Sequence, residues 1–188
     1  MVQFYNFFYG DRNKIPCEFD KMLSDTKKLN QEYPGKKPTG LDFLILNLFS
    51  CFGLLTMQVD SSGKPGADVL SFDSKTLDVF IVGCTTGIIK DDLKTIDALL
   101  HEMENELPEV FKKCNVTPLI ISTGTQKFVH SDLKDAKDVG ALLLGLENLK
   151  KIVEMLCTGR KIKDLVDYFD VLRTEQNESV ETSLNPEY

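Results

Sequence analysis

The sequence lacks the features that mark membrane and secreted proteins. No uncharged apolar run reaches the roughly 20 residues that a membrane-spanning helix needs, and the longest, from Phe43 to Val59, is interrupted by polar residues and by Gly53. The amino-terminal residues have neither the basic segment nor the continuous apolar segment of a signal peptide. The five cysteines form no CxxC pair and cannot all pair within one chain. We therefore expect a reduced, cytoplasmic protein that does not associate with membranes.

The sequence also lacks a large excess of charge. It has 22 basic and 29 acidic residues, a net charge of -7, and 42% hydrophobic residues in 188 positions. This composition excludes a disordered or collagen-like chain and suits a single domain with a well-formed core. The acidic balance argues against a broad, non-specific nucleic-acid surface, although a local basic patch is compatible with it.

The spacing of apolar residues predicts an α/β fold. Residues 1–40 are expected to form a strand-helix extension, residues 41–173 the main domain and residues 174–188 a flexible acidic tail. Strands are predicted at 54–60, 67–72, 77–84, 118–122 and 139–144; helices at 41–52, 91–107, 132–138, 146–156 and 162–172. Three strands in succession before the first crossover argue against a plain doubly wound sheet.

Two short segments carry a resemblance to a known superfamily. After a helix that ends at Gly53, the chain reads GADVL at Gly66–Leu70 and, beyond a hairpin, VFIVGCTTG at Val79–Gly87. This order resembles the PD-(D/E)xK nuclease superfamily, the restriction-endonuclease-like fold, over about residues 41–158. The resemblance implies an αβββαβ core with a mixed central sheet flanked by helices. It also implies that Asp68 lies on the strand next to Gly83–Thr85, with a helix crossing over to the strand at 118–122.

The resemblance further implies where a catalytic site would lie. In the family an Asp on the second strand and a Glu-x-Lys on the third hold Mg²⁺ and an attacking water beside the scissile phosphate. Asp68 takes the Asp position, so Asp68 and Thr85 become the candidate catalytic residues, and Asp68 and Asp42 the candidate metal ligands. The Glu-x-Lys positions fall on Gly83, Cys84 and Thr85, which supply neither the carboxylate nor the amine. Cys84 itself is interpreted as a small buried residue.

Two functions follow from this departure. The first is a nuclease-fold protein with a degenerate site that binds nucleic acid or a protein, a homodimer being compatible with the sequence. The second is an active Mg²⁺-dependent nuclease whose missing groups come from neighbouring residues, with Lys90 or Lys94 as the cation. The carboxylates considered for relocation are Asp42, Asp73, Asp78, Asp91, Asp92 and Glu102. Asp68 alone has a simpler interpretation as an acceptor for backbone N–H groups at a turn.

A third interpretation concerns small polar residues that follow two predicted strands. Thr85, Thr86 and Gly87 follow one strand, and Thr123 and Gly124 follow the next. If the two strands are parallel neighbours, these loops lie side by side and offer hydroxyl and N–H donors to a nucleotide or a small anion. Neither segment matches a phosphate-binding glycine motif, so the pattern predicts a class of ligand only.

Overall fold

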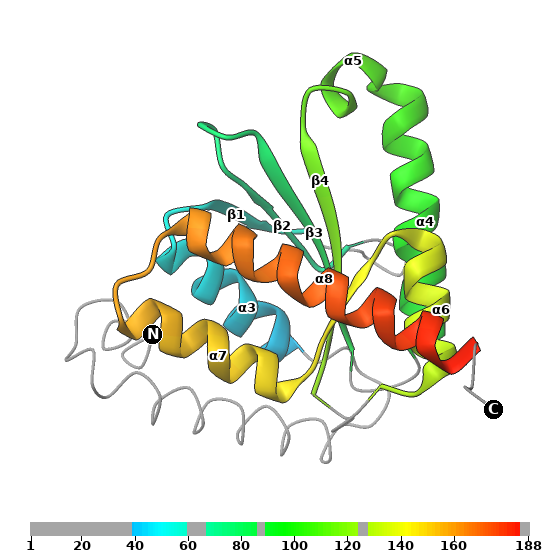
Figure 1. The fold of residues 1–188 in the computed structure, drawn as a ribbon. Coiled ribbons are helices and arrows are strands. Elements are labelled where there is room, and N and C mark those ends of the chain that lie inside the picture. The colour runs from blue at the N-terminus through cyan, green and yellow to red at the C-terminus, as the bar shows by residue number, and fades with distance from the viewer. Residues whose placement is uncertain (1–38, 60–66, 86–88, 124–127, 185–188) are drawn as a thin grey trace.

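The computed structural model describes residues 39–59, 67–85, 89–123 and 128–184 (Figure 1). The strand and helix expected before residue 39, and Thr86, Gly87 and Gly124 of the predicted anion site, lie outside the described residues. In the part of the chain that is described, no helix is both long enough and apolar enough to cross a membrane.

The fold is built on one mixed sheet in which five strands follow one another in chain order. The strands are β1 (Leu55–Gln58), β2 (Val69–Phe72), β3 (Asp78–Thr85), β4 (Asn115–Ser122) and β5 (Leu142–Leu144). β1, β2 and β3 pair antiparallel, whereas β3, β4 and β5 pair parallel. The register sets Val69 opposite Val82 and Thr85 opposite Ser122, so the carboxyl ends of β3 and β4 are level.

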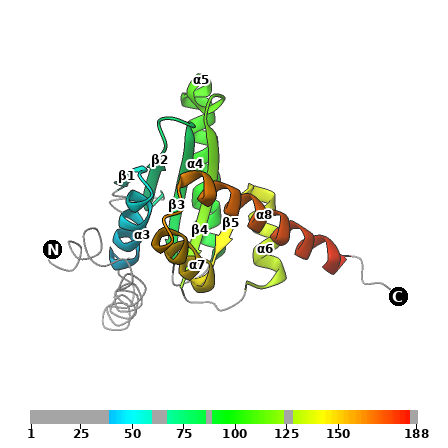
Figure 2. The same ribbon diagram turned by 60° about the vertical axis from the view of Figure 1, so that its left-hand side comes forward.

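Helices cover both faces of this sheet. They are α3 (Thr39–Cys51), α4 (Ile89–Glu106), α5 (Pro108–Phe111), α6 (His130–Val139), α7 (Leu146–Cys157) and α8 (Ile162–Leu184). α3, α7 and α8 share a hydrophobic core with one face, and α8 crosses in front of the strands in Figure 1. α4 and α6 pack on the other face, and Figure 2 shows the strands between α3 on the left and α6 on the right.

β3 lies at the centre of the sheet, between β2 and β4, and its side chains are therefore buried on both faces. Phe80 points toward α3 and α8, where its ring meets Phe49 at 5.8 Å and Phe169 at 5.6 Å between centroids, both edge-on. Side chains alternate along a strand, so Cys84 lies on this same α3 face, whereas Ile81 packs on the α4 side.

The α/β class, the mixed sheet and the order of its strands confirm the sequence prediction. Asp68 is hydrogen-bonded to β3, and the chain crosses through α4 to β4, also as expected. The short helix α5 was not predicted. The strand expected from residue 139 starts only at Leu142, because α6 extends to Val139 and Gly140 ends it with a left-handed backbone, φ 74°.

The carboxyl-terminal prediction needs a larger correction. The helix expected to end at Leu172 continues to Leu184. The prediction of a flexible tail from residue 174 is therefore wrong for residues 174–184. Tertiary contacts support this polar segment: Val180 is buried, Lys137 of α6 pairs with Glu181 at 2.8 Å, and Gln176 bonds to β5. The division of the chain into an extension, a domain and a tail otherwise remains a prediction.

Candidate functional site

Asp68 is the first residue of the candidate site. It directly precedes β2, and its own N–H donates to the carbonyl oxygen of Val82 at 2.8 Å. Its carboxylate oxygen Oδ2 accepts the Cys84 N–H at 2.7 Å, and the residue is 6% exposed. Asp68 is thus anchored to the last residues of β3 by backbone and side chain together. The bond to Cys84 also fulfils the simpler interpretation of Asp68 as an acceptor for a backbone N–H.

Asp42 and Cys84 complete a compact group around Asp68, which we call the Asp-Asp-Cys cluster. Asp42 lies in the first turn of α3, next to the fully buried Leu41, and is itself 4% exposed. One ligand atom from each of Asp42, Asp68 and Cys84 lies within 4.8 Å of the other two. The structure therefore brings together the two carboxylates predicted as metal ligands, and it adds Cys84 as the third member.

Gly83 does not belong to this cluster. A Cβ atom on Gly83 would lie 3.1 Å from Cδ1 of Ile120 and 3.3 Å from Cδ1 of Ile96, on the α4 side of the sheet. A side chain at position 83 would thus face Ile96 and Ile120, whereas the side chain at position 84 lies with Asp42 and Asp68. The sequence held a signal for this: residues two apart on a strand share a face, so Cys84 shares the face of Phe80 and Val82, and Gly83 lies on the other face.

The environment of Cys84 keeps its thiol protonated. Burial raises the pKa of Cys84 well above its ordinary value, the negative charges of Asp42 and Asp68 raise it further, and a hydrogen bond to Asp42 adds to the effect. A protonated thiol near two carboxylates acts as a donor to them rather than as a third anion. The cluster thus has two negatively charged members at most.

The donor set fits Mg²⁺ poorly. Mg²⁺ prefers oxygen ligands in near-octahedral geometry, and the cluster offers it carboxylates from Asp42 and Asp68 with sulfur in the third place. Two carboxylates and a cysteine sulfur together suit a borderline-soft ion such as Zn²⁺ better, and the Cys84 thiol would have to lose its proton to bind it. No step of Mg²⁺-dependent chemistry can be derived from these residues.

The threonines of the predicted anion site lie at the level ends of β3 and β4. Thr85 and Thr123 are both about 7% exposed, and the Thr123 N–H donates to the Thr85 carbonyl oxygen at 3.4 Å. The two strand ends are therefore neighbours, as the hypothesis required. A catalytic role for Thr85, and anion binding by this pair with Thr86, Gly87 and Gly124, remain predictions.

Several residues considered for relocated catalytic groups have other partners. Asp78 lies at the opposite end of β3, where it accepts hydrogen bonds from Thr76 and, at 3.1 Å, from Asn115. Lys90 lies 3.7 Å from Asp135 of α6, with a side chain that is 62% exposed. Neither arrangement directs the group toward Asp68.

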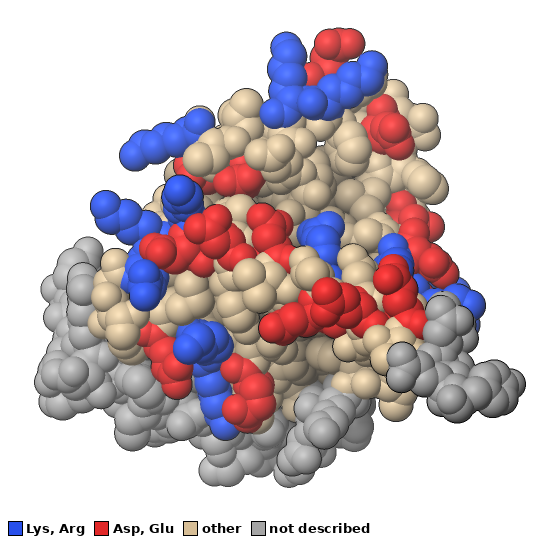
Figure 3. Space-filling view, viewed as in Figure 1, with Lys and Arg blue, Asp and Glu red and all other residues tan. Residues whose placement is uncertain are grey.

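Charges on the α7 and α8 side of the molecule are mixed. Acidic side chains follow α8 across this face in Figure 3, and basic side chains lie both among them and around its margins. A cavity of about 510 Å³ between the end of α3, the β2–β3 turn and the start of α8 contains three of these cations, Lys75, Arg160 and Lys161, together with Asp73. These three basic side chains thus form a small positive patch whose charge is partly offset by neighbouring acidic residues.

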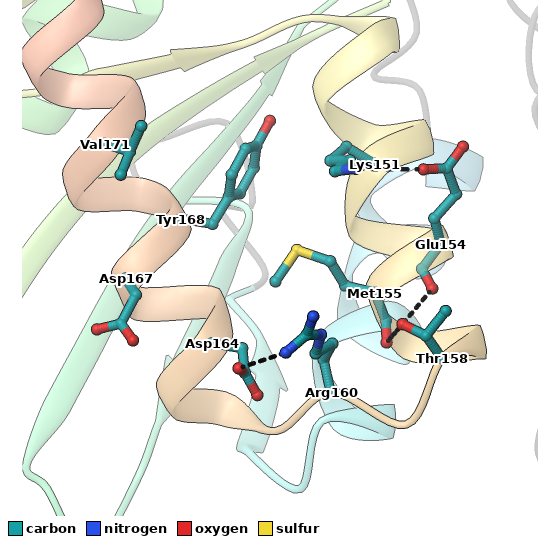
Figure 4. A pocket seen from close by; sticks show the side chains of 9 residues that line it. All are labelled: Lys151, Glu154, Met155, Thr158, Arg160, Asp164, Asp167, Tyr168 and Val171. Atoms are coloured by element: carbon teal, nitrogen blue, oxygen red, sulfur yellow. Dashed lines mark hydrogen bonds and ion pairs between the residues drawn. The ribbon is translucent and has the colours of Figure 1, made fainter.

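A further cavity of about 470 Å³ lies between α7 and α8 (Figure 4). Met155 and Tyr168 form its apolar part, and charged pairs border it, with Arg160 3.4 Å from Asp164 and Lys151 3.6 Å from Glu154. Neither this cavity nor the 510 Å³ cavity is lined by a member of the Asp-Asp-Cys cluster.

Comparison with known proteins supports the fold. The chain matches no protein-family model. It also matches no curated protein sequence. Its structure is similar to the crystal structure of the small subunit (R.BspD6I2) of the heterodimeric restriction endonuclease R.BspD6I, with a TM-score of 0.60 and 13% identity. The match covers 87% of this chain and 98% of that subunit. The chain therefore has a restriction-endonuclease-like fold.

Proposed function

We propose that this protein is a nuclease-fold protein with a degenerate active site, which acts by binding a macromolecular partner and does not cut nucleic acid. The observation that carries the proposal is Cys84: a buried, protonated thiol lies beside Asp42 and Asp68, and no residue from Gly83 to Thr85 supplies the Glu or the Lys that the resemblance calls for. Phosphodiester hydrolysis requires a firmly held metal ion and stabilisation of the developing negative charge.

The expected loss of rate is large. Removing one preorganised group that stabilises the transition state typically costs about a hundredfold or more in rate. Here a metal-binding carboxylate is replaced by a thiol, and the sequence has no Lys two residues after Cys84, where the family motif supplies one. Because the two deficits act on the same step, hydrolysis should fall below detection.

A protein partner fits the charge better than nucleic acid does. Non-specific affinity for DNA comes mainly from counterions released by clustered Lys and Arg, and this chain has a net charge of -7. The similar solved structure is a subunit of a heterodimeric enzyme, which supports a role beside another protein chain. Duplex DNA should therefore bind weakly at physiological salt, and tight binding with a steep salt dependence would instead identify nucleic acid as the partner.

A second candidate function rests on the convergence of Asp42 and Asp68. Two buried carboxylates within 4.8 Å of one another could hold a divalent ion, so an active metal-dependent nuclease with a relocated cation is the alternative.

A cleavage assay separates the two functions. The purified full chain is incubated with plasmid DNA, single-stranded DNA and RNA in the presence of Mg²⁺, Mn²⁺ or Zn²⁺, beside an Asp68→Ala variant purified identically. We expect no difference between the two proteins with any substrate or metal. Cleavage by the wild-type chain that Asp68→Ala abolishes would establish the alternative.

A further inference from the structure

The two outer strands of the sheet formed by the described residues, β1 and β5, differ in how their outward backbone groups are bonded. At β5, the side-chain amide of Gln176 donates to the carbonyl oxygen of Leu143 at 2.7 Å and accepts the Leu143 N–H at 3.2 Å. Gln176 thus occupies the backbone groups that an added strand would use. Covering an edge in this way prevents unwanted pairing with other chains.

β1, at the other edge, presents apolar side chains to solvent. Leu55, Met57 and Val59 are 66%, 56% and 36% exposed, and we call these three residues the β1 strip. Alternation places them on one face of the sheet, next to their half-buried cross-strand neighbours Leu70 and Phe72. On the opposite face of β1, Thr56 is half-buried and hydrogen-bonds to Ser50 and to the Leu46 carbonyl oxygen of α3, whereas Gln58 is exposed.

The backbone of β1 is also arranged to accept another strand. The Val59 N–H donates to Asp68 at 3.0 Å across the β1–β2 ladder. Hydrogen-bonded and non-hydrogen-bonded positions alternate in an antiparallel pair, so Leu55 and Met57 direct their N–H and C=O groups toward β2. Thr56 and Gln58 therefore direct theirs outward, away from the sheet.

We infer that β1 is the contact through which two copies of this chain form a dimer. In an antiparallel pairing of the two β1 strands, Thr56 of each copy exchanges backbone hydrogen bonds with Gln58 of the other. Met57 then meets its own copy on the two-fold axis, and Leu55 meets Val59. The same patch contacts itself, as a two-fold symmetric interface requires, and the sheet becomes continuous across both copies.

Charge and spacing select a second copy as the occupant. No charged residue occurs between Leu54 and Val59, although the whole chain has a net charge of -7. The net charge makes two copies repel one another as they approach, and a contact through β1 places no charged residue of this segment against another. Leu55 and Val59 each lie two residues from Met57, so two β1 strips that run in opposite directions place an apolar residue opposite an apolar residue at all three positions. This inference goes beyond the proposed function and does not depend on it.

Cysteine cross-linking tests the register. Directly opposed residues in a non-hydrogen-bonded pair have Cα atoms about 4.5 Å apart, which is within the range of a disulfide. Met57→Cys should therefore give a covalent dimer under mild oxidation. Leu55→Cys is the matched control, because the two copies of residue 55 are offset by four residues, or roughly 13 Å along the strands. It should cross-link only when mixed with Val59→Cys.

A charge variant tests the interface without covalent chemistry. Sedimentation velocity of the full chain over a range of concentrations should show a monomer–dimer equilibrium, and Met57→Lys should raise its dissociation constant by more than about tenfold, since an edge Lys opposes strand pairing. Val171→Lys, at a site that is also 56% exposed but lies on α8, should leave it unchanged. A wild-type chain that stays monomeric, a dimer indifferent to Met57→Lys, or cross-linking of Leu55→Cys by itself would overturn the inference.

Discussion

The two ends of β3 each lie beside a buried carboxylate, and the surroundings of the two carboxylates differ. Asp78, at the amino end, is 8% exposed and accepts hydrogen bonds on both oxygens, from Asn115 and from Thr76. Asp68, beside the carboxyl end, is 6% exposed, accepts the Cys84 N–H, and lies close to the carboxylate of Asp42.

This difference agrees with a structural role for Asp78 and with our proposal that Asp68 belongs to a degenerate site. Donors from its own hairpin and from β4 stabilise Asp78 where it is. Asp68 shares its surroundings with a second carboxylate and a protonated thiol, an arrangement that folding alone does not favour. Clusters that local stability does not explain are expected at functional sites or at the remains of them.

The largest effect on stability should come from replacing Asp78, at the amino end of β3. Asp78→Ala leaves the Thr76 hydroxyl and the Asn115 amide without their acceptor, so we expect the free energy of unfolding to fall by about 2 kcal/mol. Urea denaturation at neutral pH measures this change. Asp73→Ala is the control within the same hairpin: Asp73 bonds to the Lys75 N–H and to Thr76 at exposed positions, so its loss should be smaller. Equal losses would contradict the distinction.

The next effect is a dependence of the free energy of unfolding on pH, which comes from Cys84 near the carboxyl end of β3. The pKa of Cys84 is raised in the folded protein above the ordinary 9.0, so above pH 9 the unfolded chain releases a proton that the folded chain keeps. Stability is therefore lost as pH rises from about 9 toward the folded pKa. By pH 10, Cys84 alone should reduce the free energy of unfolding by roughly 1 kcal/mol.

Cys84→Ala isolates this contribution. The measurement is the change in unfolding free energy between pH 7.5 and pH 10 in the wild type and in the variant, since other titrating groups are common to both. Burial also raises the pKa of Cys51, to about 12, so the variant should lose only part of the pH dependence. A variant with an unchanged pH dependence would show that Cys84 is not held in its protonated form.

The smallest effect should come from replacing the carboxylates by amides. Asp68→Asn keeps an oxygen that can accept the Cys84 N–H and removes one negative charge near Asp42, so unfolding free energy should change by less than about 0.5 kcal/mol. Asp78→Asn should cost more, because an amide has one acceptor oxygen for the two donors that Asp78 now binds. Thermal denaturation of both variants compares them directly, and a greater loss in Asp68→Asn would reverse the assignment of the two ends.

The sequence by itself was sufficient for the order of the strands and the longer helices, and it named Asp68 and Asp42 as candidate site residues. Apolar periodicity distinguishes the uniformly buried β3 from the amphipathic α4, and both patterns are local. The resemblance to the nuclease superfamily implied that Asp68 lies beside the end of β3, and the short hairpin between β2 and β3 leaves little freedom in their pairing.

Only the tertiary structure decided the rest. Asp42 joins the site through the packing of α3 on the sheet, and Cys84 rather than Gly83 joins it because of the face to which each residue of β3 points. The polar residues of α8 beyond Leu172 are stabilised as a helix by contacts with α6 and β5. Such contacts link residues distant in sequence, and a polar segment has little apolar periodicity by which to predict them.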